Sequence, residues 1–273
     1  MKKLTTLLLV LVFAGTTAFA QNTADVDQVG IDHEATVDQV GSNDATINQN
    51  GGNTNLGFID QEGDDNTATI LQPNINGQYS GNAPEKAKAY QYQRGNGNEA
   101  AIRQAASFSD FAQQDQWGTD LVANVKQGNN TDAESWQKQR GTGHNADTRQ
   151  SSSDNAISRQ EQHGNVGDGN VADTDQINSD GASSDIYQDG DNYAKALQRS
   201  ARGTTSIDID QFGQGNSAIV NQGKAYVDSG NDLTAIIYQD GMDNMATINQ
   251  SFNGHTADIN QSGSLNDATV SQQ

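Results

Sequence analysis

A glutamine recurs along almost the whole chain at intervals that are mostly ten to twelve residues, with eleven the commonest step. A fixed interval of this kind is typical of repeat architectures, in which each short unit buries its side chains by stacking on its neighbours. The chain is therefore expected to form a stacked array. The recurring positions are Gln28, Gln39, Gln49, Gln61, Gln72, Gln93, Gln104, Gln116, Gln127, Gln139, Gln150, Gln188, Gln198, Gln211, Gln222, Gln239, Gln250, Gln261 and Gln272.

A fuller unit surrounds these glutamines and reads Q-x-G-x-x-N-x-A-x-x-x-Q. Incomplete copies begin at Gln28 and Gln139, where His33 and His144 replace the asparagine, and at Gln116, where Leu121 does. The five complete copies have their Gln, Asn, Ala and closing Gln at Gln61, Asn66, Ala68, Gln72; Gln93, Asn98, Ala100, Gln104; Gln211, Asn216, Ala218, Gln222; Gln239, Asn244, Ala246, Gln250; and Gln261, Asn266, Ala268, Gln272. Their glycines are Gly63, Gly95, Gly213, Gly241 and Gly263.

Each unit alternates in the manner of a β-strand followed by a turn. In Ala246–Gln250, for example, Ala246, Ile248 and Gln250 share one face, and the two residues between them share the other. Gly with Asn or Asp between the strands suits the positive φ angles of tight turns. One strand and one turn use about eleven residues, so two of them make a coil of about 22 residues. The sequence predicts an all-β solenoid of roughly eleven coils and roughly 50 Å in height.

The composition explains why stacking is needed. Only 33% of the residues are hydrophobic, which by itself is typical of disorder. Stacked coils place Ala, Ile or Val, Gln and Asn at equivalent inward positions. Each Gln or Asn amide then donates to one neighbouring coil and accepts from the other, which satisfies buried polar groups.

Three segments break the interval, near residues 73–88, 163–175 and 223–234. The first contains the only two prolines, Pro73 and Pro84. The distance from Gln72 to Gln93 is 21 residues, close to two normal steps, which predicts a poor coil or a bulged loop that keeps the register. The domain organisation expected is residues 1–20 as a signal peptide and residues 21–273 as one repeat solenoid.

The N-terminus has the features of a secretory signal peptide. Lys2 and Lys3 precede the apolar run Leu7–Phe13, and Ala18-Phe19-Ala20 fits a cleavage site, with Gln21 as the expected mature start. The apolar run is too short for a transmembrane anchor. The formal net charge of -20 disfavours nucleic acid and anionic membranes as partners, and the absence of cysteine excludes a disulfide framework.

No motif predicts catalysis or a cofactor. Of the histidines His33, His144, His163 and His255, three occupy the Asn position, which favours a ladder or turn substitution over a metal site. The paired carboxylates Asp64 and Asp65 lie in a repeated turn. The segment Asp189–Asn192 resembles part of a calcium loop but lacks its closing acidic residue. Trp117, Trp136 and the tyrosines are interpreted as singly scattered surface aromatics rather than an adhesive face.

The repeat unit resembles that of the curlin family, the subunits of bacterial curli fibres, and the resemblance covers nearly all of residues 21–273. It implies secretion as an unfolded chain through an outer-membrane pore, and then polymerisation at the cell surface with a nucleator subunit. It also implies roles in adhesion and biofilm matrix. The last coil carries Asp267 and neither Lys nor Arg, whereas the nucleator's last repeat is typically basic, so the chain is more like the major subunit.

The sequence therefore predicts a secreted homopolymer with no enzymatic role, no cofactor and no membrane insertion. The repeat runs to the final residues without a cap, and such a strand edge accepts another subunit by β-augmentation. The alternative is a monomeric β-solenoid that binds ice or carbohydrate. Threonines recur on the outer face at Thr36, Thr46, Thr69 and Thr247, but an ice-binding face requires a more regular Thr-x-Thr array.

Overall fold

The computed structural model describes residues 21–73, 87–106, 108–164, 169–200, 204–223, 232–251 and 254–272, and these contain strands and turns but no helix. The predicted signal peptide lies outside the described residues. The strands are β1 (Thr23–Ile31), β2 (Glu34–Asn53), β3 (Leu56–Pro73), β4 (Lys88–Asn96), β5 (Glu99–Ala105), β6 (Phe111–Thr119), β7 (Val122–Gly128), β8 (Glu134–Thr142), β9 (Asn145–Ser151), β10 (Ile157–His163), β11 (Val171–Ile177), β12 (Ser183–Arg199), β13 (Thr205–Gln222), β14 (Leu233–Met242), β15 (Met245–Gln250), β16 (Thr256–Ser264) and β17 (Asp267–Gln272).

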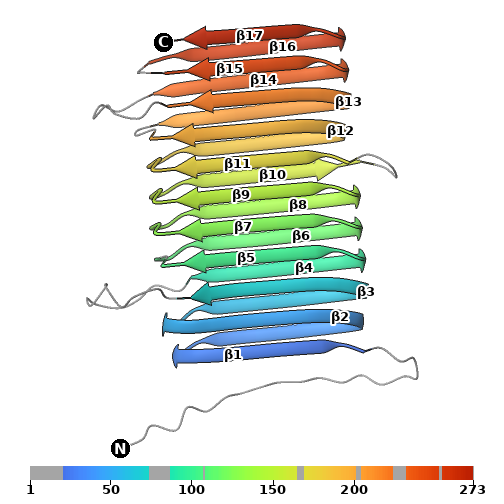
Figure 1. Cartoon of the computed structure of the whole chain (residues 1–273), viewed down its shortest axis with the longest axis vertical. Coiled ribbons are helices and arrows are strands. Elements are labelled where there is room, and N and C mark those ends of the chain that lie inside the picture. Colours follow the sequence, from blue (N-terminus) through green and yellow to red (C-terminus); the bar gives the residue numbers. More distant parts are fainter. Residues whose placement is uncertain are drawn as a thin grey trace, which may run out of the picture.

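The strands stack as a β-solenoid, as the repeat predicts (Figure 1). Each coil has two strand segments, and each segment pairs in parallel with the equivalent segment one coil away, as β6 does with β8 and β7 with β9. The long strands β2, β3, β12 and β13 bend and contribute one segment to each of two sheets. The first sheet contains β1, β5, β7, β9, β11, β15, β17 and the later halves of the long strands. The second contains β4, β6, β8, β10, β14, β16 and their earlier halves.

The inner faces of the two sheets form the core, because side chains alternate between buried and more exposed along each strand. Two aliphatic clusters fill this core. One lies in the early coils and includes Ile47, Ile59 and Ile70, and the other lies in the late coils and includes Ile209 and Ile248. Between them the inward positions are largely polar. The expectation that every coil places Ile or Val at the aliphatic position is therefore wrong for the middle coils.

The two edges of the solenoid differ, which the repeat pattern does not predict. At one edge the chain passes from the second sheet to the first. Each turn there begins with a glycine that lies two residues after a core glutamine, so we call this edge the glycine edge. The opposite edge, from the first sheet to the second, we call the variable edge. All five complete repeat copies begin in the second sheet and cross the glycine edge. The segments outside the described residues fall mostly at the variable edge: 74–86, 107, 201–203, 224–231 and 252–253.

The register persists across the three irregular segments, parts of which lie outside the described residues. Gln72 bonds to Gln104, 32 residues away, and Gln61 to Gln93, also 32 residues away. The 21 residues from Gln72 to Gln93 therefore connect two successive strand segments, as an ordinary interval of about eleven residues does, although their length equals two such intervals. The coils that include 165–168 and 224–231 take 26 and 28 residues. Extra length in these coils adds no layer to the stack.

Candidate assembly site

Two continuous glutamine ladders run through the core, one on each sheet. In each, the side-chain Nε2 of one glutamine donates to Oε1 of the glutamine in the next coil, over 2.7–3.1 Å. In the first sheet the ladder joins Gln28, Gln49, Gln72, Gln104, Gln127, Gln150, Gln176, Gln198, Gln222, Gln250 and Gln272. In the second sheet it joins Gln39, Gln61, Gln93, Gln116, Gln139, Gln162, Gln188, Gln211, Gln239 and Gln261.

Most ladder amides also bond to the backbone of the facing sheet. Gln116 Nε2, for example, donates to Gln139 Oε1 at 3.0 Å and to the carbonyl of Glu99 at 2.9 Å. Both N–H groups of such an amide thus have acceptors, and its oxygen accepts from the preceding coil. A fully buried amide with these partners avoids the desolvation cost of an unpaired polar group.

Asparagines form a second kind of ladder along the glycine edge. The backbone N–H of Asn66 donates to Asn43 Oδ1, that of Asn98 to Asn66 Oδ1, and that of Asn244 to Asn216 Oδ1, each at 3.1 Å. Alanines of the same repeats line the first sheet beside the ladder, and Ala68, Ala100, Ala218 and Ala246 are at most 1% exposed. In the last coil Asn266 and Ala268 are partly exposed.

Histidine takes over the asparagine role where the repeat carries it. The buried His144 accepts the backbone N–H of Asn170 on Nδ1 at 3.2 Å, and His33 accepts that of Asn55 in the same way. Burial is the main reason that the pKa of His33 lies below its usual value. A neutral imidazole with Nδ1 as the acceptor reproduces the asparagine oxygen, so His144 is a substitute in the asparagine ladder of the glycine edge, and His33 makes the equivalent contact at the variable edge. Among the described residues no group of His, Asp or Glu is arranged to hold a metal ion.

A third glutamine ladder lies in the middle of the second sheet and was not predicted. Gln91, Gln114, Gln137 and Gln160 occupy the position that Ile59 and Ile186 hold in flanking coils, and their amides bond in series at 2.9 Å. The first acceptor, Gln91 Oε1, is buried without a hydrogen-bond partner. The reason is its neighbour Ile59, which has no donor to offer. The signal in the sequence was Gln two residues before a ladder Gln in four successive coils.

The glycine edge permits close stacking of its turns. Gly63, Gly95, Gly213, Gly241 and Gly263 all have positive φ, between 99° and 131°. A Cβ on Gly95 would lie 1.9 Å from the carbonyl oxygen of Gly118 in the next coil. At Gly263, in the last coil, the nearest atom to such a Cβ is 3.8 Å away. Stacking on the next coil therefore excludes a side chain at the internal positions.

The outer face of the second sheet gathers aromatic side chains, so the interpretation of Trp117, Trp136 and the tyrosines as scattered is wrong. Rings contact one another from Phe58 to Tyr90, Phe111 and Trp136, with centroids 5.2–6.2 Å apart. A second run joins His163, Tyr187, Phe212 and Tyr238. Among the described aromatic residues only Phe108 and Tyr193 lie elsewhere.

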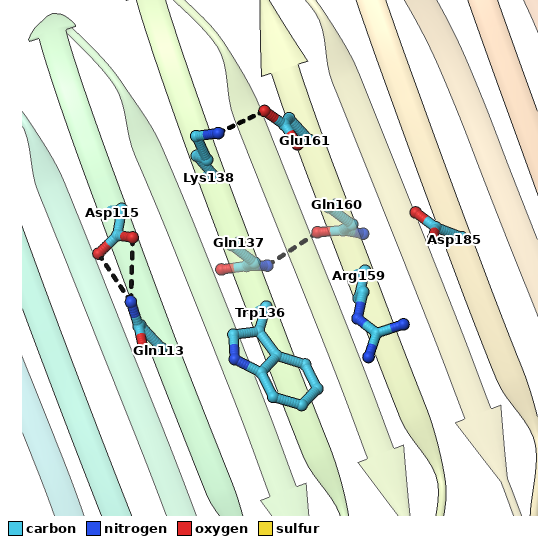
Figure 2. Close-up of a pocket in the computed structure, with 9 residues that line it drawn as sticks. All are labelled: Gln113, Asp115, Trp136, Gln137, Lys138, Arg159, Gln160, Glu161 and Asp185. Carbon is cyan, nitrogen blue, oxygen red and sulfur yellow. Dashed lines mark hydrogen bonds and ion pairs between the residues drawn. The ribbon is translucent and has the colours of Figure 1, made fainter.

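A shallow groove of about 310 Å³ crosses this face at β6, β8, β10 and β12 (Figure 2). Arg159 lies over the ring of Trp136, 5.0 Å from its centroid, and Lys138 Nζ lies 2.6 Å from Glu161 Oε1. Burial raises the pKa of Glu161, but hydrogen bonds from Lys138 and His163 outweigh it and leave that pKa below its usual value. Burial raises the pKa of Asp115. The groove offers charged and aromatic surface, but no paired acid and base on a common reacting position.

Each end of the stack leaves one strand segment of each sheet with a single neighbour in the described part of the chain: β1 and the early half of β2 at one end, and β16 and β17 at the other. β1 pairs with β2 alone, and β17 pairs with β15 alone. The carbonyls of Asn266, the residue before β17, and of Gln272 at its end accept from the backbone N–H groups of Met245 and Ser251 in the preceding coil. Because N–H and C=O groups alternate along a parallel strand, those of Asp267, Thr269 and Ser271 point to the open side. These groups have the geometry to pair with one more parallel strand.

Comparison with known proteins agrees with this geometry. The profile of the curlin associated repeat matches residues 42–73 and 241–273. A search of curated proteins returns no match. Each matched region spans one step of the first-sheet ladder, Gln49 to Gln72 and Gln250 to Gln272, and the coils between them continue that ladder without interruption. Residues 42–73 and 241–273 thus carry the curlin associated repeat, the repeat of extracellular curli fibres.

Proposed function

We propose that this chain is a secreted structural subunit that polymerises into extracellular curli-like amyloid fibres, which serve cell adhesion and the biofilm matrix. One observation carries the proposal. The terminal strands β1 and β17 end an in-register parallel stack, and each leaves one side without a partner in the described residues. The family match and the predicted signal peptide support the extracellular location.

The growth step is the addition of β1 of an incoming subunit to β17 of the subunit before it. In that arrangement Gln28 of the new subunit would accept from Gln272, and the first-sheet ladder would continue from one copy to the next. Contacts of this head-to-tail type do not close on themselves, so they generate open filaments. By resemblance, we further propose a nucleator subunit and an outer-membrane secretion pore as partners, with this chain in the role of the major subunit.

The role is structural rather than enzymatic. The long rows of buried amides and alanines serve stacking. The outer face of the second sheet is aromatic and charged, and that of the first sheet is charged, but the described residues hold no group arranged to bind a metal ion. The alternative role as a monomeric ice-binding or carbohydrate-binding module predicts a soluble monomer. Whether the purified chain assembles into fibres therefore distinguishes the two proposed functions.

A single proline substitution on the open edge of β17 tests the proposal. The chain beginning at Gln21 should form thioflavin-positive fibres with a 4.7–4.8 Å cross-β spacing. Thr269→Pro removes an N–H on the open side of β17, where proline is tolerated as on other edge strands. We expect this variant to keep the circular dichroism of the folded chain, to form no fibres alone, and to terminate wild-type fibres at substoichiometric amounts.

Thr269→Val is the matched control, because it changes the same side chain but keeps the N–H. It should form fibres at the wild-type rate. A wild-type chain that remains monomeric for days at neutral pH and physiological salt would contradict the proposal, and so would a Thr269→Pro variant that elongates normally.

A further inference from the structure

The outward side chains of the second sheet form a regular grid, with four positions on each strand. Cross-strand pairing places them in columns along the stack, such as Tyr92, Asp115 and Lys138 on β4, β6 and β8. Because the strands are in register, the position of every outward side chain on this face follows from its place in the repeat. The charge pattern of the face can therefore be read strand by strand.

From β4 to β16 the charges divide this face into two bands, whereas the first two strands, β2 and β3, carry the outward carboxylates Glu34, Asp38, Asp60 and Glu62 and belong to neither band. On β4, β6, β8 and β10 lie five cations and three carboxylates, and we call this region the basic band. On β12, β13, β14 and β16 the outward charged residues are all aspartates, and we call this region the acidic band. The basic band has Lys88, Arg94, Lys138, Arg140 and Arg159 with Asp115, Glu134 and Glu161, and the acidic band has Asp185, Asp189, Asp208, Asp210, Asp240 and Asp258.

The bands have equal length, four strands each, and they meet between β10 and β12. We infer that a second copy of this chain docks on this face, related by a two-fold axis that runs along the strands between β10 and β12. This operation reverses the stack direction and keeps each of the four outward positions opposite its equivalent. The basic band of each copy then covers the acidic band of the other, which is the self-complementary contact that a two-fold interface requires.

Three of the pairs that this axis creates are complementary. Arg159 faces Asp185 of the second copy, and Lys138 faces its Asp210. Arg140 faces the second copy's Phe212, a cation–π partner that resembles the contact of Arg140 with Trp117 at 4.4 Å within one copy.

The remaining positions pair without conflict. Asp115, for instance, faces Tyr238 of the second copy. Across the four outward positions of the eight strands, no carboxylate meets a carboxylate and no cation meets a cation. Like charges in contact across an interface cost several kcal/mol, so their complete absence favours this pairing over other alignments of the same two faces.

The size of the contact is adequate. Eight strands at about 4.8 Å and seven residues at about 3.3 Å cover roughly 900 Å² on each copy, close to the usual area per partner in a stable complex. The aromatic runs through Trp136 and Phe212 would be buried in it, as would the groove of Figure 2. The inference goes beyond polymerisation, since it concerns side-to-side pairing of solenoids and needs only the folded chain.

A charge-swap experiment tests the pairing. One variant carries Lys138→Glu and Arg159→Glu, and the other carries Asp185→Lys and Asp210→Lys. Each variant alone should fail to pair, because the contacts of residue 159 with residue 185 and of residue 138 with residue 210 then join like charges across the two-fold axis. A one-to-one mixture should pair again, because the reversed basic band of one variant faces the reversed acidic band of the other. Pairing is measured by sedimentation velocity of the folded soluble chain at 20 mM salt and by filament width in electron microscopy.

The control variant carries Lys126→Glu and Arg149→Glu on the outer face of the first sheet and should pair like the wild type. The inference is overturned if either reversed variant pairs alone, if the mixture does not recover pairing while both variants keep their β-sheet circular dichroism, or if the wild-type chain stays single at low salt. Binding of a polysaccharide in place of self-pairing would also overturn it. Single-width filaments would leave the proposed function intact, whereas paired soluble chains without filaments would refute that function and support the pairing.

Discussion

Gln61 Nε2 donates to Gln93 Oε1 at 2.7 Å, although 32 residues separate the two along the chain. Neighbouring steps in the same ladder take 22 or 23 residues. The ladder therefore selects its partner by the position in the repeat rather than by a count of residues. Register is set by the buried amides and alanines that must align, and connections of different length are tolerated between them.

Interrupting a ladder in the middle should cost more than interrupting it at its end. Gln139→Leu leaves Gln162 Oε1 without its donor and removes the acceptor of Gln116 Nε2. We expect a loss of about 2–4 kcal/mol in the free energy of unfolding, since an unpaired polar group is buried. Gln261→Leu, at the end of the same ladder, removes the acceptor of Gln239 Nε2 and a donor to the Met245 carbonyl, leaves no ladder glutamine without its donor, and should cost about 1–2 kcal/mol. Urea unfolding of freshly purified monomer measures both, and equal losses would contradict the ladder account.

The third ladder predicts an asymmetry between two similar substitutions. Gln91→Ile extends the aliphatic column from Ile59 by one coil and only moves the orphaned acceptor from Gln91 to Gln114. Gln114→Ile leaves both Gln91 Oε1 and Gln137 Oε1 without donors. We expect Gln114→Ile to be less stable than Gln91→Ile by about 1–3 kcal/mol. The comparison uses the same unfolding assay, and a reversed order would show that the amide series does not stabilise the middle coils.

Two glycines of the glycine edge provide a test of close stacking. Gly95→Ala would place a Cβ 1.9 Å from the Gly118 carbonyl oxygen, so the turn must shift and the variant should lose about 3 kcal/mol or more. Gly143 also has positive φ, 73°, but a Cβ there has no atom within 4 Å. Gly143→Ala should therefore cost only about 1 kcal/mol, from the left-handed backbone. Thermal unfolding of the two variants should differ clearly, and similar melting temperatures would refute the steric argument.

Stability should rise as the pH falls from 7 towards 4.5. Asp185 and Asp208 are cross-strand neighbours on β12 and β13. Burial raises the pKa of Asp208, and burial together with the charge of Asp208 raises that of Asp185. A carboxyl whose pKa is higher in the folded chain than its unfolded value of 3.8 contributes stability that is present at low pH and lost as the pH rises through the folded pKa.

Asp208→Asn should accordingly increase stability at pH 7 and reduce the difference between pH 7 and pH 4.5. Urea midpoints at the two pH values measure this difference in the variant and the wild type. An unchanged pH difference in Asp208→Asn would mean that this pair does not govern the acid stabilisation.

The sequence predicted the solenoid, the period and the inward positions because each depends on local alternation, which the chain repeats many times. The coil with residues 74–86 shows the limit of that reasoning. A spacing of 21 residues fits two short steps or one long one, and only the pairing of Gln72 with Gln104 decides between them. The substitution of His144 for asparagine was recognisable because the histidine falls at a repeat position.

The features that were missed depend on relations between coils. Gln91, Gln114, Gln137 and Gln160 are unremarkable in a chain rich in glutamine, and become a ladder only when the coils are aligned. The aromatic face was missed for the same reason, because its rings come from different repeats and only the stacking of the coils brings them together. The difference between the two edges depends on which half of each coil carries the complete repeat.

Continuation of the first sheet from one subunit to the next is the central claim, and engineered cysteines test it directly because the chain has none of its own. If Gln272 of one subunit aligns with Gln28 of the next, Ser271 lies beside Asp27, within the Cα separation of a disulfide. The Asp27→Cys, Ser271→Cys chain should form intermolecular disulfide ladders when its fibres are oxidised, and Thr23→Cys with Ser271→Cys, four residues out of register, should not. Fibres in which the second pair links as efficiently as the first, or in which neither links, would contradict the account.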